Sequence, residues 1–217
     1  MRGLLAKDFR LLANQKQFFA TIVMIAVILM LSGQDIFFAI GYCTMLCGFF
    51  TISTINYDEY NNGFSFLFKM PITRRIYVLE KYLFALLIGG GVWLVTSMAG
   101  LVYNSVKNPT FIATQWIGSA VMIFIVMGIM LCVMLPIQIK FGAEKSRVAT
   151  FVLMFFIFAV AAVGAKMMSQ TEVEMEVADW ISNMVMGNWL LIGGVAFIVA
   201  VAISILVSVR IMEKKQF

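Results

Sequence analysis

Long apolar runs alternate with short polar segments along most of the 217 residues. A helix that crosses a bilayer needs about 20 mostly apolar residues, and most of the runs approach or exceed that length. The pattern therefore predicts an all-α polytopic membrane protein with six transmembrane helices. We place the spans at residues 17–32, 36–55, 77–103, 115–139, 148–165 and 189–209. Because the length leaves no room for a separate soluble domain, residues 1–217 are expected to form a single transmembrane domain.

Residues 1–16 differ from the runs that follow. Leucine and phenylalanine side chains fall on one broad arc of a helical wheel, and the four basic residues lie mostly on the other side. This predicts an amphipathic helix at the membrane surface. Asp8 falls within the apolar arc, and two interpretations stay open. In the first, Asp8 snorkels at the membrane edge or caps a basic neighbour. In the second, it contacts a partner protein or the charged segment at 57–81.

The segment 57–81 is the longest polar interruption in the first half of the chain. It carries three acidic and four basic residues. We predict a cytoplasmic coupling loop over residues 56–76, because a structured, charged loop is what a membrane domain needs if a soluble partner pushes on it. Pro71 should stop the structure before it, and Thr73 should cap a helix that begins at Arg74.

Two further polar segments separate the later runs. Residues 140–147 form a second predicted charged loop, and Pro136 just before it predicts a break or kink. Residues 166–188 contain the clearly acidic part of the chain, with apolar residues at helical spacing. They predict an extracellular amphipathic segment.

The basic residues divide unevenly between the two sides of this six-span topology. Fourteen of the 16 Lys and Arg residues fall on the side of the termini, and only Lys107 and Lys166 fall on the other. Lys and Arg are enriched in the cytoplasmic loops of membrane proteins. We therefore expect a protein of the cell membrane with both termini in the cytoplasm. The net charge of +5 then reflects topology and does not indicate a nucleic-acid partner.

Composition narrows the function further. Apolar residues make up 62% of the chain, against about 45–50% in a soluble domain, and the mean hydropathy is +0.97. The sequence has no histidine, which excludes histidine-ligated haem, HExxH metalloproteases and serine–histidine chemistry. The three cysteines lie inside apolar runs without a disulfide or metal pattern. We expect no catalytic residue, no metal and no cofactor in this chain.

The sequence offers no source of energy of its own. The phosphate-binding loop GxxxxGK[ST] is absent, and Leu31-Ser32-Gly33-Gln34 lacks one glycine of the ABC ATPase signature and lies at the end of a span. No Asp, Glu, Lys or Arg lies in the middle of a predicted span, which argues against transport driven by a coupled ion. Any translocation must be driven from outside the membrane domain.

Two stretches resemble small permeases of the type-2 ABC exporter family. The first is Arg2-Gly3-Leu4-Leu5-Ala6-Lys7-Asp8-Phe9. The second combines Asp58-Glu59, Gly63, Met70-Pro71-Ile72-Thr73-Arg74-Arg75 and Val78-Leu79-Glu80-Lys81-Tyr82. Met70 stands where the family often has leucine, and Glu80 where a small residue is common, which alters the local charge. The chain is similar to permeases that export phenol-soluble modulins and other amphipathic antimicrobial peptides in Gram-positive bacteria.

The resemblance implies the membrane half of an ATP-driven exporter. Two permeases, identical or paired, would associate with two ATP-binding subunits, and those subunits would bind ATP and Mg²⁺. The surface helix and the coupling loop would transmit the motion. The residues implied in coupling are Lys7, Asp8, Asp58, Glu59, Pro71, Thr73, Arg74, Arg75 and Glu80.

Charge suggests how some of these residues act. We expect Asp58 and Glu59 to meet basic groups on the ATPase. Arg74 and Arg75 should meet acidic groups or lipid phosphate, and the alternative for both is that they set topology and anchor the chain to lipid.

The substrate is less constrained by the sequence. The chain has 17 Met and 20 Phe, and methionine-rich surfaces adapt to many apolar shapes. We expect an amphipathic peptide or a similar hydrophobic molecule, although ordinary lipid-facing residues would give the same composition. A competing hypothesis is a non-transporting immunity or sensor protein that binds a toxic peptide in the membrane.

Overall fold

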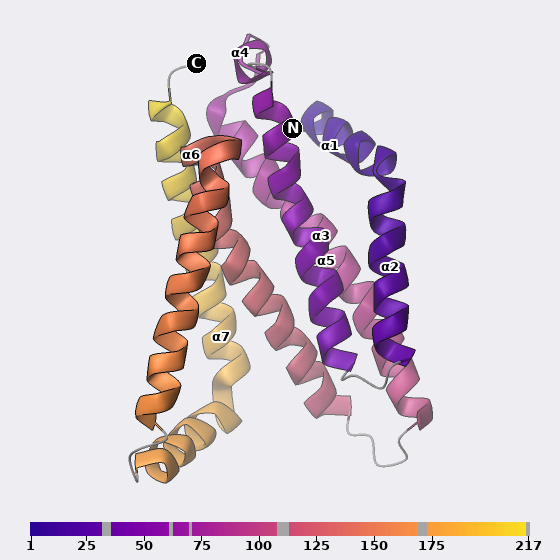
Figure 1. Ribbon diagram of the computed structural model, residues 1–217, viewed down its shortest axis with the longest axis vertical. Coiled ribbons are helices and arrows are strands. Elements are labelled where there is room, and N and C mark those ends of the chain that lie inside the picture. The colour runs from indigo at the N-terminus through magenta and orange to yellow at the C-terminus, as the bar shows by residue number, and fades with distance from the viewer. Residues whose placement is uncertain (32–35, 61–62, 70, 108–112, 169–172, 216–217) are drawn as a thin grey trace.

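The computed structural model shows a bundle of helices that run between two ends of the molecule (Figure 1). It describes residues 1–31, 36–60, 63–69, 71–107, 113–168 and 173–215, with side chains throughout except at 2, 30–31, 107, 113–115, 143–144, 147, 153–168 and 173–192. The helices are α1 (Arg2–Asn14), α2 (Lys16–Leu31), α3 (Ile36–Glu59), α4 (Gly63–Leu67), α5 (Arg74–Lys107), α6 (Ala113–Met168) and α7 (Val173–Lys214).

Several of these helices are long and apolar enough to cross a membrane. Four qualify in the described part of the chain, namely Ile36–Glu59, Arg74–Val106, Trp116–Gly142 and Gly193–Lys214. A fifth results if α1 and α2 form one broken span, because together they pass the same test but bend by 64°. The chain is therefore an all-helical, multi-pass membrane protein.

The count of six spans stays a prediction. α2 has 16 residues, which is short of the roughly 20 that a span usually needs. The span predicted at 148–165 and the acidic segment predicted at 166–188 lie mostly outside the residues whose side chains are described. The surface position of residues 1–16 likewise stays a prediction.

α6 reverses direction at Gly142. The backbone there has φ 73° and ψ −179°, and Figure 1 shows both arms of α6 running from this turn toward the opposite end of the bundle. A Cβ atom at this position would lie 2.3 Å from Oε1 of Glu59, so the turn requires glycine. The charged loop predicted at 140–147 is therefore a tight turn at Gly142, and the residues on either side of this turn are helical. Pro136 stays inside the helix.

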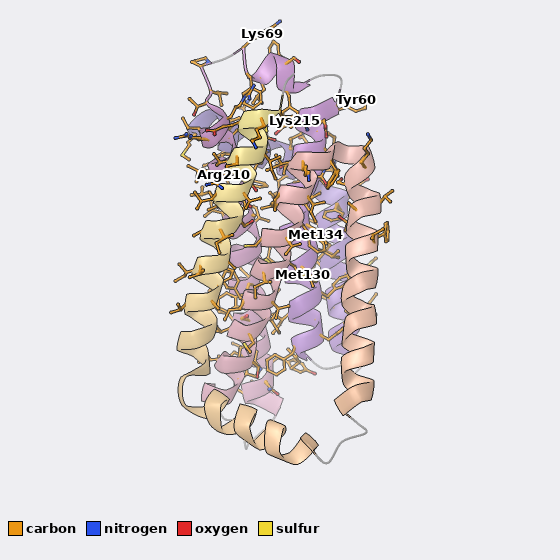
Figure 2. All side chains as sticks on the ribbon, turned by 90° about the vertical axis from the view of Figure 1, so that its left-hand side faces the viewer. Tyr60, Lys69, Met130, Met134, Arg210 and Lys215 are labelled. Atoms are coloured by element: carbon orange, nitrogen blue, oxygen red, sulfur yellow. The ribbon has the colours of Figure 1, made fainter. Side chains whose placement is uncertain are left out.

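One end of the bundle gathers the polar elements. α1, α4, the turn of α6 and the last turns of α7 lie there in Figure 1, and Figure 2 places Tyr60, Lys69 and Lys215 at the same end, with Met130 and Met134 deeper in the bundle. We call this the polar end. The loop predicted at 56–76 is only partly right, because α3 continues to Glu59 and α4 occupies Gly63–Leu67.

The main apolar core lies directly beneath the polar end. Six helices contribute buried side chains to it, among them Leu4, Ile55, Phe64, Tyr77, Leu135 and Met212. The core therefore holds the short helices α1 and α4 against the long ones. Deeper in the bundle, α5 and α6 pack so closely that a Cβ on Gly89 would lie 2.6 Å from Cε of Met127.

Candidate functional site

Three helices bring charged side chains together under α1. Lys7 and Asp8 come from α1, Asp58 from the last turn of α3, and Glu80 and Lys81 from the second turn of α5. We call these five residues the carboxylate–lysine cluster. Charged side chains are rarely buried unless they are paired, so their contacts decide whether this end of the bundle is stable.

Lys81 is the centre of the cluster. Its side chain is fully buried, and its Nζ pairs with Asp8, lies 2.8 Å from Oδ2 of Asp58 and donates to Oγ1 of Thr54 at 3.0 Å. These contacts give each of the three ammonium protons a partner. A buried ammonium group without partners costs several kcal/mol, so Lys81 depends on α1 and α3 being in place.

Lys7 and Tyr77 complete the surroundings of Asp58. Lys7 pairs with Asp58, and its Nζ also lies 3.2 Å from Oδ1 of Asp8. The hydroxyl of Tyr77 donates to Oδ2 of Asp58 at 3.1 Å. Burial alone would lower the pKa of Lys7, but the carboxylates of Asp58 and Asp8 outweigh it and raise the pKa above its usual 10.5. Lys7 therefore stays charged and ties α1 to α3.

Glu80 is the least compensated member of the cluster. Its side chain is fully buried, and neither carboxyl oxygen has a hydrogen-bond partner among the described residues. The nearest recorded cation is Nζ of Lys81, 3.8 Å from Oε2. The cluster thus sets three carboxyl groups against two ammonium groups.

A second set of contacts ties the start of α5 to the end of α7. Nη1 of Arg74 donates to the carbonyl oxygens of Met212 at 3.2 Å and of Glu213 at 2.5 Å. Nε of Arg75 donates to Oε1 of Glu213 at 2.7 Å. The last carbonyl groups of a helix have no partner within it, so the arginines stabilise the end of α7.

Lys215 extends these contacts to α3 and α6. Its Nζ donates to the carbonyl oxygen of Ile139 at 3.2 Å and lies 3.4 Å from Oε1 of Glu59. Glu59 also lies against the glycine turn of α6. The ends of α3, α5 and α7 and the turn within α6 are therefore connected by polar contacts at the polar end.

The start of α5 has the predicted local structure. Oγ1 of Thr73 accepts a hydrogen bond of 3.4 Å from the backbone nitrogen of Ile76, as an N-cap side chain does. Pro71 is exposed in the connection between α4 and α5. Pro71 and Thr73 therefore lie at the surface of the polar end, in the turn before α5.

The nine predicted coupling residues fall into three groups by exposure. Asp8, Asp58 and Glu80 are buried, whereas Pro71, Thr73 and Arg75 are exposed. Lys7, Glu59 and Arg74 are intermediate. Asp58 is buried and pairs with Lys7 and Lys81 of the same chain, and its expected contact with basic groups of a partner stays a prediction.

Both arginines have partners within the chain, and their expected contacts with acidic groups of an ATPase or with lipid phosphate stay predictions. Glu213 pairs with Arg75, and carbonyl groups of α7 accept from Arg74. For Asp8, the structure supports contact with the charged segment 57–81, which contains Lys81. Sequence reasoning missed Lys81 as a site residue. The signal that could have pointed to Lys81 was Asp8. An acidic residue on the apolar arc of a helix is buried when that arc packs, and a buried carboxylate needs a cation beside it.

An open groove lies beside the cluster. It has a volume of about 520 Å³ and runs between α1, the end of α3 and the connection from α4 to α5. Its walls include Leu4, Phe66 and Ile72, with Lys7 and Asp58 among the lining residues. Phe66 is 67% exposed, so the polar end presents apolar surface as well as charge. In the described part of the chain, no group of acidic or cysteine residues is arranged to hold a metal ion.

Comparison with known proteins places the chain in a family. A family model described as ABC-2 family transporter protein matches residues 3–213. The chain is a member of the ABC-2 family. No curated protein and no solved structure matches it.

An ABC-2 permease is the membrane part of an ABC transporter and works with an ATP-binding subunit. The matched region of this ABC-2 permease contains the whole carboxylate–lysine cluster and the contacts of Arg74 and Arg75.

Proposed function

We propose that this permease belongs to an ATP-driven exporter that moves amphipathic peptides, or similar hydrophobic molecules, out of the cell or its membrane. It works as a pair with an identical or related permease, and a pair of ATP-binding subunits binds ATP and Mg²⁺. We place the polar end in the cytoplasm, because 14 of the 16 basic residues fall on the side of the termini in the six-span topology.

The observation that carries this proposal is the buried cluster beneath α1 and α4. Lys81 on α5 pairs with Asp8 on α1 and Asp58 on α3. Pulling these helices apart would leave buried charges without partners, which costs several kcal/mol for each. A push on the polar end therefore moves α1, α3 and α5 together. We propose that α1, with its Lys7 and Asp8, and the segment 56–76 couple the ATPase to the spans in this way.

The exposed residues of the polar end supply the contact with the ATPase. Phe66 and Pro71 offer apolar surface, and Arg75 offers charge. The side chains of Arg75 and Glu213 are 72% and 42% exposed. Exposed ion pairs are worth about 0–1 kcal/mol, so Arg75 can exchange Glu213 for an acidic group of a partner at little cost. Thr73 and Arg74 set the direction in which α5 leaves this surface.

The test is transport in proteoliposomes that contain the permease with and without its ATP-binding subunit. A labelled amphipathic peptide should be moved only when the ATPase and hydrolysable ATP are both present. Movement that persists without ATP would contradict the proposal. An immunity or sensor protein would instead bind the peptide and protect the membrane without an associated ATPase, so co-purification of the two subunits distinguishes the two functions.

A further inference from the structure

A second cavity at the polar end takes no part in the ionic contacts. Its volume is about 430 Å³, and it lies between the start of α2 and the last turns of α3. It is lined by Gln15, Phe18, Phe50, Ser53, Asn56 and Tyr60, together with Tyr57. Gln15 joins α1 to α2 at their 64° bend, so the cavity sits where the chain turns into the bundle.

The walls of this cavity combine two chemistries. The rings of Phe18 and Phe50 lie with their centroids 6.0 Å apart, and Phe19 packs behind Phe50 at 5.5 Å. Polar groups come from Gln15 and from the last two turns of α3. Nε2 of Gln15 donates to the hydroxyl of Tyr57 at 3.0 Å, and both residues line the cavity.

The polar groups that line the cavity are uncharged and can donate or accept hydrogen bonds. Oδ1 of Asn56 accepts from Nε2 of Gln138. The amide nitrogen of Asn56 can donate a hydrogen bond, and the hydroxyl of Ser53 can both donate and accept one. None of the lining residues carries a charge. A site of this kind suits a ligand with apolar groups and a few neutral polar groups.

We propose that this cavity binds an uncharged segment of the amphipathic peptide, with a bulky apolar side chain against Phe18 and Phe50 and neutral polar groups at Ser53 and Asn56. The inference rests on the proposed function. The volume falls within the roughly 300–1,000 Å³ of small-ligand pockets and so takes a few side chains, not a whole helix. A phospholipid headgroup fits poorly, because phosphate is usually bound by Arg or Lys and the cavity is lined by neither.

Tyr57 connects this cavity with the coupling site. It lines both the cavity and the groove beside the cluster, and it precedes Asp58 in the last turn of α3. A peptide segment that displaces the side chain of Gln15 from Tyr57 therefore acts one residue from an ionic contact that holds α1. This gives the bound peptide a physical route to the elements that face the ATPase.

The first experiment fills the cavity. A fluorescent amphipathic helix composed of Leu and Gln is bound to the permease in phosphatidylcholine nanodiscs. Ser53→Phe should weaken binding about tenfold. Ser105→Phe, the same change at an exposed position of α5, should leave it unchanged. Equal binding by Ser53→Phe and the wild type would overturn the proposal. The proposal would also be overturned if the wild-type permease retained labelled phosphatidylglycerol but not the peptide, and Ser53→Phe lost the bound lipid.

The second experiment needs no variant. The same peptide carrying photo-leucine should crosslink the wild-type permease at residues 15–18 or 50–60, and crosslinks confined to other segments would overturn the site. Transport then separates the two proposals. ATP-driven export that Ser53→Phe leaves intact overturns the cavity and keeps the exporter. Crosslinking at these residues without ATP-driven export supports the cavity and overturns the exporter.

Discussion

Lys81 is the residue on which the polar end most depends. It is fully buried, and it joins carboxylates from two other helices. Breaking a buried ion pair by removing one partner usually costs about 3–5 kcal/mol, because the other partner stays charged and unpaired. The same pairs contribute much less when both members are replaced by apolar groups. The cluster is therefore a strong constraint on which helices meet, and its removal as a whole is a milder change than its disruption.

We expect Lys81→Met to lower the free energy of unfolding by about 3–5 kcal/mol. Asp8 and Asp58 would keep their buried carboxylates with one cation fewer. The measurement is chemical or thermal unfolding in detergent. Lys214→Met removes an exposed lysine and should change stability by no more than about 0.5 kcal/mol. The proposed role of Lys81 is wrong if the two variants unfold alike. Asp8→Asn should restore part of the loss when it is combined with Lys81→Met.

The second prediction at this scale concerns pH. Because the pKa of Lys7 is raised above 10.5, its contribution is fully present below that pH and is lost as the pH rises through the higher value in the folded protein. Lys7→Met should therefore destabilise the protein by a constant amount from about pH 6 to about pH 9. The difference from the wild type should shrink above pH 10.5. A difference that already disappears near neutral pH would contradict the assignment.

Sequence reasoning could recognise the charged residues of the site except Lys81, but it could not predict how they pair. Asp8 was conspicuous because it interrupts an apolar arc, and Glu80 because it departs from the family pattern. The partner of Asp8 lies 73 positions further along the chain, and only the packing of α1 on α5 brings the two together. No local pattern encodes such a contact.

At the scale of helices, apolar runs were good predictors of position and poor predictors of length. The runs at 36–55 and 77–103 correspond to α3 and α5, but α3 extends to Glu59 and α5 begins at Arg74. Both extensions are polar. They remain helical because Asp58 pairs with lysines and because Thr73 caps the first turn of α5. Hydropathy alone does not predict that a polar turn stays helical when tertiary contacts pair its side chains.

The turn of α6 gives a prediction at the same scale. Gly142→Ala should lower the free energy of unfolding by about 1–3 kcal/mol, since φ 73° with ψ −179° is a conformation available almost only to glycine. The added methyl group would also overlap the carboxylate of Glu59. Unfolding in detergent is the measurement.

Gly91→Ala is the matched control for this change. Gly91 lies inside α5 with open space around it, and alanine favours a helix over glycine by about 0.5–1 kcal/mol. The control should therefore be neutral or slightly stabilising. A loss in Gly91→Ala equal to that in Gly142→Ala would mean that the turn is not specific for glycine.

At the scale of the whole molecule, composition and hydropathy were enough to predict a helical membrane protein, and the family match agrees with the resemblance carried by the two short motifs. Orientation in the membrane and the number of spans stay predictions. What composition does not reveal is that three helix ends and the turn of α6 are connected at one face by Arg74, Arg75, Glu59 and Lys215. That connection is what makes the polar end a plausible surface for a partner to push.

Arg75 tests this role without disturbing the fold. Arg75→Ala should change stability by less than about 1 kcal/mol, because it breaks an exposed ion pair. It should nevertheless reduce co-purification of the ATP-binding subunit and ATP-driven transport. Glu213→Gln breaks the same pair but keeps Arg75, and it should leave both intact. Arg210→Ala, at another exposed arginine, serves as a second control. Equal losses in Arg75→Ala and Glu213→Gln would assign the effect to the ion pair and not to the partner.

The pairing of Asp8 with Lys81 also has a consequence for biosynthesis. The ribosome delivers α1 before α5, so Lys81, which pairs with the buried Asp8 of α1, arrives only after α2, α3 and α4 have emerged. Until then, burying Asp8 would be unfavourable, so α1 should stay in water or among lipid headgroups. α1 is thus translated before α5 but reaches its final position only after α5 is present, and a nascent chain truncated before residue 81 should leave α1 open to proteases.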